Sequence, residues 1–115
     1  MSASAYSLSV AIPADGFEVV SGEPVIGGLH GASRHYYCPH CKSWLFTRPE
    51  GMDAFVNLRA TMLDDCAWFA PFAETSREEG FPWANTGARH SYRGLPSPAV
   101  YPALLAEFAQ SDIHP

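Results

Sequence analysis

The cysteines Cys38 and Cys41, spaced as C-x₂-C, constrain this chain more than any other feature. Thiolates at this spacing can both reach one tetrahedral ion, and Zn²⁺ takes sulfur ligands at about 2.3 Å. The flanking segments, 33–37 and 44–46, are rich in aromatic residues and typical of strands. Pro39 fixes its own φ and removes a backbone donor, which favours a tight turn. The pattern predicts a zinc knuckle between two antiparallel strands.

Two alternatives remain open for this pair. The cysteines can be reduced thiols in a turn that bind nothing, or a thioredoxin-like redox pair. The redox interpretation needs a helix N-terminus after the first cysteine to lower its pKa, whereas a β pattern follows here. A closed structural zinc site has four ligands, and Cys66 is the third and last cysteine of the chain. The sequence therefore predicts half of a zinc site, with Cys38 and Cys41 as the metal ligands.

Composition limits the class of protein. A chain of 115 residues is expected to form one domain with a single core. Its net charge of −5 argues against nucleic acid as the partner, since phosphate binding needs a basic surface. No apolar run approaches the roughly 20 residues of a membrane span, and no secretory signal opens the chain. Three cysteines, two of them in C-x₂-C, fit a reducing cytoplasm better than a disulfide framework.

Hydrophobic spacing predicts a mainly β fold. Ten prolines and nine glycines indicate short strands and many turns. Apolar residues alternate with polar or small ones over 6–12, the period of a half-buried strand. Further strands are expected at residues 17–20, 25–26, 34–37, 44–47 and 55–59. The expected fold is a small, twisted, mostly antiparallel β structure with a zinc-knuckle hairpin.

One helix is expected near the C-terminus. Ser97 is suited to the N-cap and Pro98 to the first helical position, where its missing N–H is not needed. Four apolar residues then follow at i, i+3, i+4 and i+7: Tyr101, Leu104, Leu105 and Phe108. The helix is expected to end at Gln110. Before it, Trp83 is expected to pack on the core, and His90 is interpreted as a surface histidine.

The order of these parts resembles the glutathione-dependent formaldehyde-activating enzyme (GFA) family. The resemblance lies in residues 36–46 with the cysteine pair, the strand pattern at 56–59 and the Leu-Asp-Asp segment at 63–65. It extends over about residues 2–83. It implies the zinc-bearing, Mss4-like β fold that this family shares with centromere protein V.

The resemblance also implies what the zinc sites of such a protein contain. In the family, an upstream C-x-C pair joins the later C-x₂-C to close a structural zinc, so Cys38 and Cys41 match half of that site. An upstream cysteine cluster holds the catalytic zinc near glutathione, and no residue of this chain matches it. Met1 aligns with an internal position, so the chain is expected to be N-terminally truncated relative to the family. Lys42 stands where the family usually has Gly.

Two functions follow. The first is membership of a zinc-dependent carbon–sulfur lyase family, similar to S-(hydroxymethyl)glutathione synthase. A small thiol such as glutathione would be its partner, and this chain is expected to be inactive as it stands. The alternative is a non-enzymatic zinc-knuckle module for protein interaction, in which a homodimer completes a four-cysteine site.

Other side chains are weighed as supporting residues. His35 and His40 are interpreted as a cross-strand polar residue and a solvent-facing residue rather than ligands. Cys66 is expected to be a small buried hydrophobe. Asp64 and Asp65 are expected to cap a turn, with catalytic acid–base work as the minority alternative. Arg59 and Arg48 can hold a carboxylate, since a guanidinium offers a bidentate fork.

Overall fold

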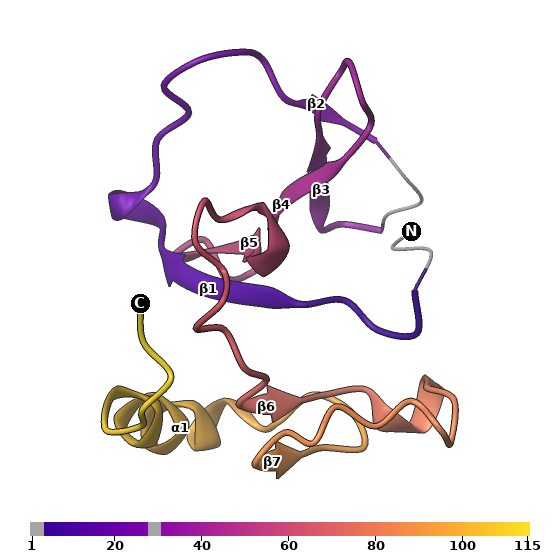
Figure 1. Cartoon of the computed structure of the whole chain (residues 1–115), viewed down its shortest axis with the longest axis vertical. Coiled ribbons are helices and arrows are strands. Elements are labelled where there is room, and N and C mark those ends of the chain that lie inside the picture. The colour runs from indigo at the N-terminus through magenta and orange to yellow at the C-terminus, as the bar shows by residue number, and fades with distance from the viewer. Residues whose placement is uncertain (1–3, 28–30) are drawn as a thin grey trace. The chain divides into compact units, whose positions relative to one another are not determined.

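A computed structural model describes residues 4–27 and 31–115 of the chain. The chain divides into two compact units, Met1–Asp64 and Asp65–Pro115. Each unit has its own sheet, and the C-terminal helix belongs to the second (Figure 1). The predicted fold class, mainly antiparallel β with one C-terminal helix, is confirmed.

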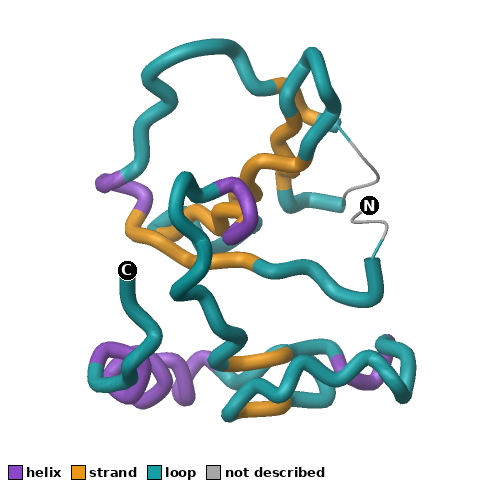
Figure 2. The backbone as a smooth tube through the Cα atoms, in the orientation of Figure 1, coloured by secondary structure: helices purple, strands orange, loops and turns teal. Residues whose placement is uncertain are grey.

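The first unit is a five-stranded antiparallel sheet with the strand order β1-β5-β4-β3-β2 (Figures 1 and 2). Its strands are β1 (Ser9–Pro13), β2 (Val25–Ile26), β3 (Arg34–Tyr37), β4 (Trp44–Arg48) and β5 (Phe55–Arg59). Strands β3, β4 and β5 follow one another as neighbours, while β1 pairs with β5 on its other side. Short connections of this kind fit the Pro- and Gly-rich sequence between the strands.

The core of this unit is small and lies on the central strands. Val56 of β5 is fully buried, and Phe46 of β4 is nearly so. Phe46 packs edge-on against Phe17, with ring centroids 4.8 Å apart, and stacks on Tyr36 at 4.6 Å. Aromatic pairs in these geometries add to the area they bury. The central strands are therefore the best-packed part of the unit.

One predicted strand of this unit is wrong. Residues 17–20 form no strand, because the chain leaves the sheet through a 3-10 turn at Ala14–Gly16. The N–H of Phe17 bonds to the carbonyl of Ala14 and closes that turn. Val19 and Val20 are adjacent and both exposed, so the segment lacks the alternation that buries one face of a strand.

The second unit contains a short parallel bridge and the helix. Strands β6 (Ala73–Glu74) and β7 (His90–Ser91) pair in parallel, and helix α1 runs over Tyr101–Ala109. A 3-10 turn at Pro98–Val100 precedes α1, and there the Ser97 hydroxyl accepts from the N–H of Ala99 at 3.3 Å. Ser97 thus caps as predicted, but it caps the 3-10 turn and the α-helix starts later. The helix ends before Gln110, as expected.

Aromatic and charged contacts hold α1 to this bridge. The ring of Phe108 meets that of Phe72 edge-on, with centroids 5.3 Å apart. His90 lies 5.1 Å from the same phenylalanine ring, and its Nε2 is 2.9 Å from a carboxylate oxygen of Glu107. His90 is therefore a half-buried structural contact between β7 and α1, whereas the sequence interpretation was a surface histidine.

Trp83 does not pack on the core as expected. Its side chain is 72% exposed and stacks on Phe81, with ring centroids 5.2 Å apart. Only Pro82 separates the two rings, so they contact each other locally instead of the interior.

In the described part of the chain, no helix is both long enough and apolar enough to span a membrane.

Candidate functional site: a cysteine knuckle and the adjoining cavity

The two cysteines lie in the turn between β3 and β4. The N–H of Cys38 donates to the carbonyl of Ser43 at 2.9 Å, and the N–H of Lys42 donates to the carbonyl of Cys38 at 3.0 Å. These bonds draw both cysteines into one tight turn. The antiparallel hairpin expected here is therefore present, and both cysteines lie in its turn.

Lys42 completes this turn in the left-handed conformation, with φ 62°. A side chain strains a residue in that region, which is why Gly is preferred there. The Lys42 side chain folds back so that its ammonium group donates to the carbonyl of Pro39. Lys42 thus adopts a conformation that glycine takes without strain.

The two thiols differ in exposure, and hydrogen bonds lower the pKa of Cys41. Cys38 is half-buried and Cys41 is exposed. Cys41 Sγ and Ser43 Oγ are hydrogen-bonded at 3.2 Å. This hydroxyl, then the Ser43 backbone N–H and then the Cys38 thiol lower the pKa of Cys41 to about 7. A thiol that ionises near neutral pH is prepared to act as a metal ligand, because the thiolate is the form that binds.

The residues present fit half of a zinc site. Two thiolates in a knuckle turn are a suitable pair of donors for Zn²⁺, but a closed structural site has four. Across residues 4–27 and 31–115, no three His, Cys, Asp or Glu side chains are grouped so that they could hold a metal ion. Cys38 and Cys41 are therefore candidate donors, and a four-ligand site would need two more.

The histidines near the knuckle are placed as interpreted. His35 lies opposite Thr47 in the β3–β4 pairing, and its Nδ1 is 2.8 Å from the Thr47 hydroxyl. Its ring also meets that of Trp44 edge-on at 5.0 Å. His40 lies in the turn itself and is exposed.

The acidic residues and the third cysteine follow β5. Asp65 Oδ1 accepts the N–H of Ala67 at 3.1 Å, so this carboxylate caps a turn as predicted. Asp64 is exposed. Cys66 is exposed as well, so the expectation of a buried hydrophobe is wrong. It is flanked by Asp65 and Ala67, both exposed, and no strand or helix includes it.

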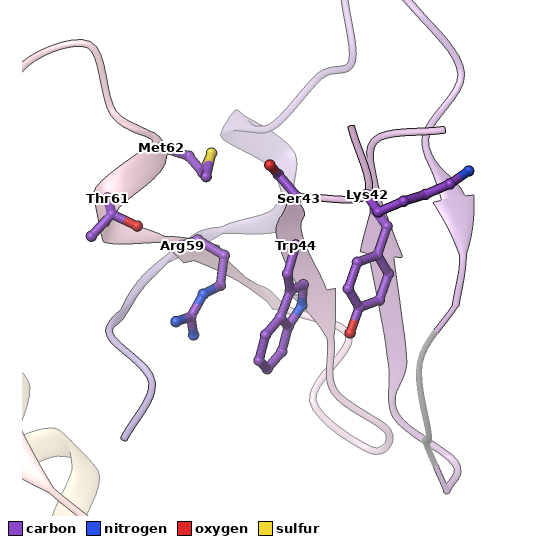
Figure 3. A pocket seen from close by; sticks show the side chains of 7 residues that line it. Lys42, Ser43, Trp44, Arg59, Thr61 and Met62 are labelled. Atoms are coloured by element: carbon purple, nitrogen blue, oxygen red, sulfur yellow. The ribbon is translucent and has the colours of Figure 1, made fainter. Parts of the chain in front are cut away.

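A cavity of about 280 Å³ adjoins the knuckle within the first unit. Its lining comes from the end of β3, the knuckle, the start of β4, the end of β5 and the 3-10 turn Ala60–Met62. The residues are Tyr37, Lys42, Ser43, Trp44, Arg59, Thr61 and Met62 (Figure 3). Two of them, Lys42 and Ser43, directly follow Cys41.

Arg59 is the buried charge of this cavity. It is 8% exposed, and burial lowers the pKa of its guanidinium, while nearby Tyr37 raises that pKa to a smaller degree. The guanidinium lies over the Trp44 ring, 4.4 Å from the centroid, and donates to Ser9 Oγ at 3.2 Å. Of the two arginines considered for a carboxylate, Arg59 lines the cavity, whereas Arg48 lies over the Phe17 ring.

Sequence reasoning missed Tyr37 and Trp44 as site residues. Both flank the cysteine turn, and the register places them opposite each other on β3 and β4. The shift in register after Tyr36 depends on the hairpin geometry and leaves no mark in the spacing of the residues. The sequence did contain one signal for them, since an aromatic residue stands on each side of the C-x₂-C pair.

Comparison of the chain with models of protein families, with curated proteins and with solved structures finds no match in any of the three.

Proposed function

We propose that this protein is a zinc-knuckle module in which Cys38 and Cys41 supply two thiolates to one zinc ion. The observation that carries the proposal is the knuckle turn itself. Backbone bonds and the left-handed Lys42 bring both cysteines into one turn, where Ser43 favours the ionised form of Cys41. Thiolate ligation is stable in a reducing compartment, which agrees with the predicted cytoplasmic location.

A second copy of the chain is the proposed source of the two remaining ligands. A two-fold dimer presents the same residues from both protomers, so two C-x₂-C turns give four thiolates. Strand β2 is a sheet edge beside β3, the strand that enters the knuckle. Val25 and Ile26 of this edge are 42% and 50% exposed, and an apolar edge strand favours pairing with another chain.

The test is zinc per chain by elemental analysis, measured together with molar mass by light scattering. We expect half a zinc per chain in a dimer. Cys38→Ser is expected to lose the zinc and to shift the dimer towards monomer, whereas His40→Ala in the same turn keeps both. One zinc per chain in a monomer, or a dimer whose zinc content survives Cys38→Ser, contradicts the shared site.

Carbon–sulfur lyase chemistry on a thiol–formaldehyde adduct, which the resemblance implies, is the second candidate. The observation that favours it is the cavity directly beside the knuckle, since a small thiol such as glutathione needs a site next to the metal. A zinc ion with an open position would act there as a Lewis acid. Only two thiol ligands are grouped in the described part of the chain, so we expect no acceleration of S-(hydroxymethyl)glutathione formation by this chain alone.

A further inference from the structure

Arg59 is a buried cation without an acidic partner. The residue is 8% exposed and so is removed from most solvent. Among the described residues, no Asp or Glu lies within ion-pair distance of it. Its contacts with Ser9 Oγ and the Trp44 ring engage one N–H and one face of the group. Buried charges in proteins are normally paired, so this guanidinium lacks its usual counter-charge.

A second polar group of the same cavity is unsatisfied. The Tyr37 hydroxyl is buried and has no hydrogen-bond partner among the described residues. A buried hydroxyl of this kind is uncommon, because it has lost its hydrogen bonds to water and gained none in the protein. Tyr37 is close enough to Arg59 to affect the pKa of its guanidinium. The Tyr37 hydroxyl, which has no partner, and the Arg59 guanidinium, which has no acidic partner, thus belong to residues that line the same cavity.

The cavity offers one positive charge. Figure 3 shows the Arg59 and Trp44 side chains extending in the same direction, whereas the Lys42 side chain extends away from Arg59. The Lys42 ammonium is engaged with the carbonyl of Pro39 in the knuckle. The indole of Trp44 covers one face of the guanidinium, so that face is closed to a ligand, while N–H groups at the edge can still meet one.

We propose that this cavity binds a small organic monocarboxylate, held by the edge of the Arg59 guanidinium and by the Tyr37 hydroxyl. A planar carboxylate can accept two parallel N–H bonds from a guanidinium. The hydroxyl of Tyr37 then donates to one of the same oxygens, and Met62 and Trp44 contact the rest of the ligand. A doubly charged phosphate suits the site less, because one cation faces it. Neither thiol takes part, so the proposal stands apart from zinc binding.

The test is a titration of the full chain followed by ¹H–¹⁵N correlation NMR at constant ionic strength. Acetate and butyrate are the carboxylate probes, and inorganic phosphate is the comparison. We expect saturable shifts of Arg59 Nε and Trp44 Nε1 with both carboxylates, and weaker binding of phosphate. Tighter binding of phosphate, or shifts that rise linearly without saturation, overturns the carboxylate assignment.

Tyr37→Phe separates ligand binding from folding. The hydroxyl has no partner in the described structure, so its removal is expected to leave stability unchanged or slightly higher. Carboxylate affinity is expected to fall about tenfold, the loss typical of a hydrogen bond to a charged group. Tyr36→Phe is the matched control, since Tyr36 stacks on Phe46 and does not line the cavity, and its affinity is expected to be unchanged. Equal affinities in wild type and Tyr37→Phe refute the site.

Discussion

Lys42 adopts a left-handed backbone conformation that a side chain disfavours. Its φ of 62° lies in the region that Gly adopts without penalty. The surrounding turn imposes this conformation, because the N–H of Lys42 and that of Cys38 are both bonded within it. The shape of the knuckle is therefore a property of the turn, and the strain at Lys42 is a local cost.

Lys42→Gly is expected to stabilise the protein. Relief of the left-handed strain is worth about 1 kcal/mol in free energy of unfolding, part of it offset by the greater freedom of Gly in the unfolded chain. Urea unfolding of the zinc-free protein measures the change. His40→Gly is the matched control, since His40 lies in the same turn without a positive φ, and it is expected to destabilise. A loss of stability in Lys42→Gly contradicts strain at this position.

Glu74 is the residue whose side chain joins the paired strands β6 and β7. Its carboxylate accepts from the Thr86 hydroxyl at 2.5 Å and from the Ser91 hydroxyl at 2.7 Å. Arg77 Nε lies 3.4 Å away. Glu74 thus joins β6, β7 and the segments beside them. The hydroxyl of Thr86, followed by that of Ser91, holds the pKa of Glu74 below its usual range.

These contacts predict a pH-dependent stability. The pKa of Glu74 is lower in the folded than in the unfolded chain, so the folded state binds fewer protons. The stabilisation is complete above the ordinary glutamate pKa of about 4.3 and is lost as the pH falls through the lowered folded pKa. Urea midpoints measured from pH 6 to pH 3 are expected to fall less steeply for Glu74→Gln than for wild type.

Glu79→Gln is the control for this pH series. Glu79 is an exposed carboxylate in the 3-10 turn Arg77–Glu79 of the same unit. Its replacement is expected to leave the slope of the midpoint against pH as in wild type. Parallel slopes for wild type and Glu74→Gln are incompatible with a carboxylate that the fold stabilises in its charged form.

At the scale of elements, the strands of the first unit were predicted, whereas the two-residue strands β6 and β7 of the second unit were not. Alternation located β1 and β5, and the aromatic segments beside the cysteines located β3 and β4. The strand expected at residues 17–20 was wrong, because strand-forming residues without alternation have no face to bury. Trp83 was misplaced for a related reason: a large apolar side chain favours burial, but its stacking on Phe81 is set by the local turn.

The site is predictable only in its local part. Cys38 and Cys41 share a turn, so their spacing alone predicts that they meet. Tyr37 and Arg59 come together because β4 pairs with β3 on one side and with β5 on the other. Their proximity depends on strand order and register, which the spacing of residues in the sequence does not predict. The buried, unpartnered hydroxyl of Tyr37 is visible only once the sheet is assembled.

At the scale of the whole molecule, the three cysteines are divided between the two units. Cys38 and Cys41 lie in Met1–Asp64, and the exposed Cys66 lies in Asp65–Pro115. The turn that holds Cys38 and Cys41 lies wholly within the first unit. Zinc binding is therefore expected to engage two thiols and to leave the third free.

Thiol titration with a disulfide reagent tests this division, because exposed and unligated thiolates react fastest. We expect one fast-reacting thiol per chain in the zinc-loaded protein and two more after zinc is removed by a chelator. Cys66→Ser is expected to abolish the fast-reacting thiol and to keep the zinc. Cys41→Ser is expected to lose the zinc and to keep the fast-reacting thiol. If Cys66→Ser releases zinc, the third cysteine is a ligand, and it binds either within its own chain or in a site shared with a second chain. Molar mass then distinguishes the two arrangements, since a site closed within one chain does not require a dimer.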